Sequence, residues 1–299
     1  MAGFRDNGGV IGTINTTSQS AAKGRFTLNE VVEALKGNVW PLQTFTMDYL
    51  VVAGGGGSTP YAGGGAGGLL QGSATAPMFS AITLTIGAGG SLYSNGSPST
   101  FYSISPYGGG GSATTPVGSG RGGYNSAAGQ AGTAGQGNKG GDGGETGPYY
   151  AGGGGGGAGA AAANSTGAPT AGGAGLTSTI SGTSVTYAGG GGGGSAYYGD
   201  NTTGLGGSGG GGRAGWSGNS YVAQPGQVNT GGGMGGTSYA PGSNATAGGG
   251  GSGVIILKIP NTRTATFSAG VTSSLSTAVS GFKIYTVTAA GVSDTVTFS

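Results

Sequence analysis

The sequence contains neither cysteine nor histidine. The absence of cysteine excludes disulfides and thiol chemistry. The absence of histidine removes the most common general base and a frequent metal ligand. Because the eight acidic residues are dispersed along the chain, no carboxylate cluster takes over these roles. We therefore expect a protein that is not an enzyme and that holds no cofactor and no metal ion.

Charge and long apolar runs are also scarce. Only 6% of the residues are charged and the formal net charge is +2, so the clusters of Lys and Arg that neutralise phosphates are missing. The longest aliphatic run, residues 254–257, is far shorter than the roughly 20 residues of a membrane span. The first residues lack the apolar core of a signal peptide. We expect no nucleic-acid partner, no membrane insertion and synthesis in a cytoplasm.

Two short patterns could indicate ligand binding. Asp142 and Glu145 would share one face of a helix with three residues per turn. Such a pair could form a weak cation site, but a solvent-exposed edge of the helix is the favoured interpretation. The pattern G-x-G-x-x-G occurs at 63–68 and 118–123, but such a glycine density produces it by chance. No GK[ST] sequence completes a phosphate loop. Neither pattern carries a functional assignment.

Glycine is the abundant residue, and it is concentrated in one stretch. All but nine of the 80 glycines lie in residues 54–253, whereas an ordinary domain has about 7% glycine. The glycines form runs at 54–57, 63–65, 108–111, 152–157, 189–194, 209–212, 231–233 and 248–251.

Disorder is the simplest alternative for this stretch, because ordering each residue costs about 1–2 kcal/mol of backbone entropy and glycine buries no side chain. Two features favour order instead. Segments that carry Leu, Ile, Val and Tyr separate the runs, and disordered linkers lack such residues. The junction Tyr-Ala-Gly recurs at 61–63, 150–152 and 187–189, which predicts a repeated geometry.

The ordered alternative is a bundle of polyglycine II helices, which have the polyproline II geometry. Such a helix has three residues per turn and directs its N–H and C=O groups outward. Without Cβ atoms, neighbouring helices can approach as closely as strands do and bond to one another. Collagen is excluded because proline is too rare around the period-three glycines of residues 129–147.

One helix is expected near the N-terminus, after an arm of residues 1–26. Thr27 and Glu30 form a T-x-x-E capping box, and Gly37 is placed to end the helix. The apolar residues of the segment recur on one face, at Leu28, Val31, Val32 and Leu35. A helix this short must dock, either on its own domain or on another subunit.

Apolar strands are expected at both borders of the glycine stretch. Residues 49–53 enter it and residues 254–259 leave it, and both are rich in β-branched residues, so we expect them to pair. Residues 81–86 alternate apolar and polar, as in a third strand. Residues 282–288 and 294–298 predict two further strands and a hairpin-rich C-terminal module.

The predicted fold class is therefore mainly irregular and all-β. A bundle of polyglycine II helices is bracketed by β-strands, with one short N-terminal helix and a β-rich C-terminal module. The expected domains are an arm and helix for attachment or docking at 1–45, the glycine-rich domain at 46–259 and a β-hairpin module at 260–299.

Four motifs follow one another at residues 49–57, 83–91, 95–101 and 248–256. In this order they resemble the glycine-rich domain of bacteriophage tail-fibre and other virion proteins. The segment from residue 24 to residue 41 is similar to one that often precedes this domain. The resemblance implies a phage structural protein with a polyglycine II sandwich, similar to distal adhesins, in which loops at the bundle tip meet the host. The chain departs from those adhesins because it lacks their N-terminal fibre-attachment region.

Binding by loops is the chemistry that remains. Aromatic and amide side chains between the glycine runs suit carbohydrate or protein surfaces, because rigid amphipathic rings give contact area at small entropy cost. For any single ring, the alternative is that it covers the flank of the bundle. The candidate receptor-binding residues are Tyr149, Tyr150, Tyr197, Tyr198, Asp200, Asn201, Trp216, Asn219 and Tyr221.

Two classes of function follow. The first is a tail fibre or adhesin that binds a host-surface glycan or outer-membrane protein through these loops. The second is a capsid decoration or other accessory protein of the virion without a receptor role, and a disordered condensate-forming protein is a more distant third. In both leading classes we expect location in the virion, contacts with other virion proteins and a homo-oligomer, with a trimer as one option.

Overall fold

The computed structural model describes residues 16–17, 22–23, 27–36, 43–146, 149–195, 203–215, 222–237 and 248–299. By its internal contacts the chain divides into two compact units. The smaller unit comprises Met1–Phe45 and Thr75–Met78, and the larger comprises Thr46–Ala74 and Phe79–Ser299.

The smaller unit contains the expected helix. Strands β1 (Thr16–Thr17) and β2 (Ala22–Lys23) pair antiparallel, and α1 (Leu28–Lys36) follows them. The capping box is confirmed, because the Thr27 N–H donates to Glu30 Oε2 at 2.7 Å and the Glu30 N–H donates to Thr27 Oγ1 at 3.3 Å. These bonds satisfy two N–H groups that the first turn leaves without helical partners.

The strands at the two borders of the glycine stretch pair as expected. β3 (Thr44–Val52) and β11 (Val254–Pro260) run antiparallel, with Val52 opposite Val254. They form the middle of a five-stranded sheet in the order β13-β14-β11-β3-β4. The remaining strands of this sheet are β4 (Leu69–Pro77), β13 (Thr272–Ser276) and β14 (Phe282–Ala289).

The third expected strand lies in a second sheet, with the order β12-β15-β5-β6. Its strands are β5 (Ala81–Thr85), β6 (Thr100–Phe101), β12 (Ala265–Phe267) and β15 (Thr295–Phe298).

The two C-terminal strands differ from the expected hairpin, because β14 pairs with β11 and β13 whereas β15 pairs with β5 and β12. The edges of β11 and β5 would otherwise leave backbone groups unpaired. Asp294 fixes the bend between β14 and β15. Its carboxylate accepts bonds from the Ser268 hydroxyl at 2.6 Å and the Gly291 N–H at 2.7 Å, which hold the pKa of Asp294 below its usual value.

The glycine-rich segments between β3 and β11 form hydrogen bonds with a period of three residues. In residues 63–68, each third N–H donates to the same neighbouring segment, so the N–H groups of this rod bond to three neighbouring segments. The N–H groups of Gly63 and Ala66 donate to Gly153 and Gly156, those of Gly64 and Gly67 to Met234 and Gly231, and those of Gly65 and Gly68 to Gly110 and Tyr107, respectively. The described parts of the stretch are thus ordered rods, called the glycine bundle below, and the mainly irregular and β fold class is confirmed.

Close packing explains why these positions are glycine. A Cβ at Gly64 would collide with the backbone carbonyls of Gly56 and Gly57, and one at Gly155 would collide with that of Gly64. No residue with a side chain could occupy either position without moving a neighbouring backbone. The runs are therefore a steric requirement of the bundle.

The three copies of the Tyr-Ala-Gly junction all have a buried alanine, but they differ in backbone conformation. Ala62, Ala151 and Ala188 are all buried, each just before a glycine run. A positive φ falls on Tyr61 (63°) at the first junction and on Ala188 (59°) at the third. The expected repeated geometry is thus present only in part.

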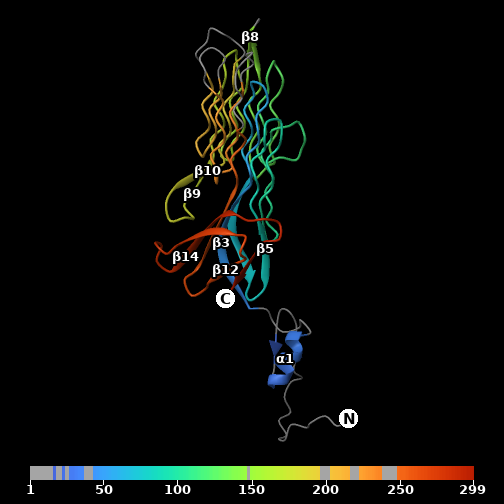
Figure 1. Ribbon diagram of the computed structural model, residues 1–299, viewed down its shortest axis with the longest axis vertical. Helices are drawn as coiled ribbons and strands as arrows, with labels where there is room; N and C mark the ends of the chain where they lie inside the picture. The colour runs from blue at the N-terminus through green and yellow to red at the C-terminus, as the bar shows by residue number, and fades with distance from the viewer. Residues whose placement is uncertain are drawn as a thin grey trace. The chain divides into compact units, whose positions relative to one another are not determined.

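An apolar cluster joins the five-stranded sheet to the glycine bundle. It combines branched side chains of β3, β11 and β14 with alanines of the rods, and burial raises the pKa of its tyrosine. Figure 1 shows the two sheets at one end of the bundle and β8 (Tyr149–Ala151) at the opposite end of the larger unit. The buried members are Leu50, Val52, Ala66, Leu69, Tyr187, Ala188, Val254, Ile256 and Ile284.

A buried serine fastens the bundle to the end of β3. The Ser99 hydroxyl donates to the Val52 carbonyl at 2.7 Å and accepts from the Gly87 N–H at 2.9 Å. Ser99→Ala removes both bonds, so the free energy of unfolding, measured by urea denaturation, should fall by about 1–3 kcal/mol. The matched variant Ser274→Ala, at an exposed position of β13, should change it by no more than about 0.5 kcal/mol. Equal effects would show that these two bonds contribute nothing.

Candidate functional site

Two of the nine predicted receptor-binding residues lie in the described residues. Tyr149 and Tyr150 belong to β8, which pairs antiparallel with β7 (Gly144–Thr146). Tyr150 is 37% exposed and stands opposite Glu145. The other seven, Tyr197, Tyr198, Asp200, Asn201, Trp216, Asn219 and Tyr221, lie outside the described residues.

The described chain on either side of those seven residues converges beside β8. Ser195 forms a bridge with Ala151, the last residue of β8. The Gly215 N–H donates to the Gly236 carbonyl at 2.9 Å, and the Tyr61 N–H donates to Thr237 at 2.7 Å. The segments that carry the predicted residues therefore join the bundle at the end opposite the sheets, which we call the turn end.

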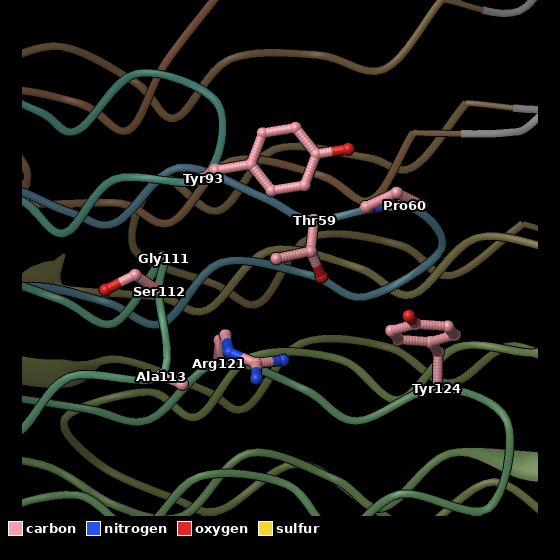
Figure 2. A pocket seen from close by; sticks show the side chains of 8 residues that line it. All are labelled: Thr59, Pro60, Tyr93, Gly111, Ser112, Ala113, Arg121 and Tyr124. Carbon is pink, nitrogen blue, oxygen red and sulfur yellow. The ribbon is translucent and has the colours of Figure 1, made fainter.

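A cavity of about 430 Å³ lies among turns at this end. We call it the Arg121 pocket, and Figure 2 shows its lining. Four stretches between residues 59 and 124 contribute to it. Its principal residues are Thr59, Pro60, Tyr93, Ser112, Arg121 and Tyr124.

Two tyrosines of the pocket stand on tight turns. Tyr93 has a φ of 62°, and its N–H donates to the Ser58 carbonyl at 2.9 Å. Tyr124 opens a turn that the Ala127 N–H closes at 3.0 Å. The two residues are 55% and 38% exposed, respectively. The bonded turns thus hold two accessible rings at defined positions.

The ring of a third tyrosine, Tyr61, lies next to the Tyr124 ring. The Tyr61 and Tyr124 rings lie 6.1 Å apart between centroids, at an angle of 53°. This separation is within the range of favourable aromatic pairs. The pair therefore limits the motion of Tyr124 beside the pocket.

Arg121 supplies the charge of the pocket. Its Nη1 donates to the Gly122 carbonyl at 3.1 Å, and its carbonyl accepts the Gln130 N–H at 2.9 Å. The Nε is buried without a hydrogen-bond partner. Among the described residues, no carboxylate forms an ion pair with this guanidinium. The cation is thus positioned by backbone and left uncompensated.

Thr59 supplies a buried hydroxyl. The residue is 8% exposed, and its Oγ1 has no hydrogen-bond partner. In Figure 2 this hydroxyl points toward the side of the pocket on which the Arg121 guanidinium lies. By contrast, the Ser112 hydroxyl is already bonded to Thr114 Oγ1 at 2.7 Å.

The two acidic residues considered for a cation site already have other partners. Lys139 Nζ lies 2.6 Å from Asp142 Oδ1, and the Gly129 N–H donates to the same carboxylate at 2.8 Å. These bonds, the one from Lys139 first, hold the pKa of Asp142 below its usual value. Glu145 accepts from the Ser126 hydroxyl at 3.3 Å. Within the described ranges, no group of three acidic side chains is arranged to hold a metal ion.

The pocket was not predicted from the sequence. Like the tyrosines predicted to bind a receptor, Tyr93 and Tyr124 each lie between glycine runs. Arg121 is one of few charged residues in the glycine stretch. An isolated charged residue together with aromatic residues between glycine runs was the sequence feature that could have indicated the pocket. Their proximity depends on how the rods are ordered in space, which composition does not specify.

A family model described as a glycine-rich domain matches residues 34–260. No curated protein and no solved structure matches the chain. No helix among the described residues is long and apolar enough to cross a membrane.

Proposed function

Since the chain belongs to the glycine-rich domain family, we propose that it is a virion structural protein whose glycine bundle is a rigid mount for a surface-binding turn end. The rods are polyglycine II helices in this proposal, and their period of three residues supports it. The protein acts as a bacteriophage tail fibre or adhesin. It binds a host-surface glycan or outer-membrane protein.

One observation carries this proposal. Exposed tyrosines on turns and an uncompensated arginine gather at the end opposite the sheets. A purely structural end would be expected to pair its charge and cover its rings. Rigid supports also reduce the conformational entropy that binding loops lose on contact. The arrangement suits attachment better than catalysis.

The test is binding of the labelled protein to bacterial cells, measured by flow cytometry across a panel of strains. In a strain that the protein binds, the triple variant Tyr197→Ala, Tyr198→Ala, Trp216→Ala should bind at least about tenfold more weakly, because aromatic residues dominate interface energetics. The matched control is Tyr102→Ala, which removes a ring that is 54% exposed beside β6. Its binding should equal that of the unchanged protein.

Unchanged binding by the triple variant would contradict attachment through the turns. If no strain is bound, the proposal gives way to the accessory role, in which the aromatic residues hold virion subunits together. Labelling the protein in the particle then gives its copy number, which is much higher for a capsid decoration than for a fibre. In either role the partners are other virion proteins and, in a homo-oligomer, further copies of the chain.

A further inference from the structure

We propose that the Arg121 pocket binds the carboxylate of an acidic sugar residue in a cell-surface polysaccharide. This inference rests on the proposed function, since it names the ligand class for one site at the turn end. It assigns the recognition of charge to Arg121, the recognition of a hydroxyl to Thr59 and the contact with the sugar ring to Tyr93 and Tyr124.

The charge of the pocket fits a single negative charge. Among the described residues that line it, Arg121 alone is charged. A guanidinium presents planar paired donors that match the two oxygens of a carboxylate. A phosphate monoester carries about −1.5 to −2 charges at neutral pH and would call for a second cation. Lys139, the nearest lysine in sequence, is already paired with Asp142. A carboxylate is therefore the better match.

The unpartnered groups indicate that the ligand also carries hydroxyls. Thr59 Oγ1 and Arg121 Nε are both buried without hydrogen-bond partners. A buried polar group left unpaired costs about 1–3 kcal/mol, which a bound partner recovers. Nearly all buried polar groups are paired, and two of the four unpaired side-chain atoms in the described residues belong to residues that line this cavity. A sugar ring offers donors and acceptors next to its carboxylate.

The aromatic residues suit a ring with apolar faces. In Figure 2, Tyr124 lies beside the space between Thr59 and Arg121, and Tyr93 lines the pocket on the other side of Thr59. Each ring is partly exposed and stands on a hydrogen-bonded turn, so it loses little freedom when a ligand stacks on it. The cavity of about 430 Å³ is within the usual range for small-molecule sites. It accommodates a short saccharide segment.

Isothermal titration calorimetry tests the assignment with the whole chain. The acidic probes are glucuronate, galacturonate and N-acetylneuraminate, and the reference probes are glucose, galactose and inorganic phosphate. We expect at least one acidic sugar to bind more tightly than every reference probe. Arg121→Met should weaken that binding about 10-fold to 100-fold, the usual value of a charge-assisted hydrogen bond. Thr59→Val, which keeps the shape but removes the hydroxyl, should weaken it less.

Arg263→Met is the matched control, because it removes the same charge beside β11 and away from the pocket. Its affinity for the acidic sugar should be unchanged. Thermal melting checks that each variant folds, and Arg121→Lys provides a second variant that keeps the charge but loses the paired donors. Its affinity should lie between those of the unchanged protein and Arg121→Met.

The outcomes separate this inference from the proposed function. If no acidic sugar binds more tightly than its neutral counterpart, or if phosphate binds as tightly as the acids, the inference is overturned. If cells are still bound in that case, attachment stands and its ligand is of another class. If an acidic sugar binds but no cell does, the pocket assignment stands and the attachment role fails.

Discussion

Replacing Gly64 by alanine should lower the free energy of unfolding by about 4 kcal/mol or more, a loss that few single substitutions cause. The new Cβ would collide with the carbonyl oxygens of Gly56 and Gly57. These are backbone atoms, so no side chain can rotate to relieve the contact. Overpacking alone costs about 1–3 kcal/mol, and each hydrogen bond broken by the displacement adds about 1–3 kcal/mol.

The position of Gly64 in the bundle explains why the damage spreads. Its N–H donates to the Met234 carbonyl at 2.8 Å, and its carbonyl accepts the Gly191 N–H at 2.9 Å. Displacing this rod therefore strains two others, which belong to chain segments more than 100 residues away. The expected result is a less cooperative unfolding transition as well as a less stable protein.

Gly291→Ala is the matched control for this prediction. A Cβ there would meet only Asp294 Oδ2, at 3.6 Å, which is an ordinary contact. Urea denaturation followed by circular dichroism should show a change of no more than about 0.5 kcal/mol for the control. If Gly64→Ala were equally mild, the close packing of the rods described above would be wrong.

The parts of the fold that sequence could predict are those with a local pattern. The capping box of Thr27 and Glu30 specified the start of α1, and alternation specified β5. The pairing of β3 with β11 followed from two apolar segments placed symmetrically around the glycine stretch. In each case, the side chains of a few adjacent residues carried the information.

The order of the rods could not be predicted, because glycine runs are chemically alike. Nothing local to residues 63–68 indicates that their partners are residues 107–110, 153–156 and 231–234. The Arg121 pocket depends on that order, since Thr59, Tyr93 and Arg121 meet only when the turns of several rods are adjacent. The turn-end tyrosines were predictable as a class, but their grouping required the structure.

The hairpin expected for residues 282–298 illustrates the same limit at the other end of the bundle. The spacing of the two strands is compatible with a local hairpin. β15 instead pairs with β5 and β12, and β14 pairs with β11 and, antiparallel, with the preceding strand β13. Local spacing does not reveal that two open edges are already present, so long-range pairing prevails over the local turn.

The junction between sheet and bundle gives the second large effect. Ile256→Ala should lower the free energy of unfolding by about 3–5 kcal/mol, toward the upper part of the range for a buried isoleucine. Ile256 is 1% exposed on the central strand β11, opposite Leu50 of β3 and Thr286 of β14. The substitution leaves a cavity, and its cost depends on how far the surroundings can collapse into it.

Collapse is restricted at this position because alanines of the rods belong to the same buried cluster. Ala66 and Ala188 belong to the same cluster, and their rods are held by neighbours on several sides. Leu275→Ala is the matched control, since Leu275 is 52% exposed on the edge strand β13, and it should cost no more than about 0.5 kcal/mol. Urea denaturation measures both variants. A loss below about 2 kcal/mol for Ile256→Ala would mean that the rods yield to fill the space, and a mount that yields in this way could not hold the turn end rigid.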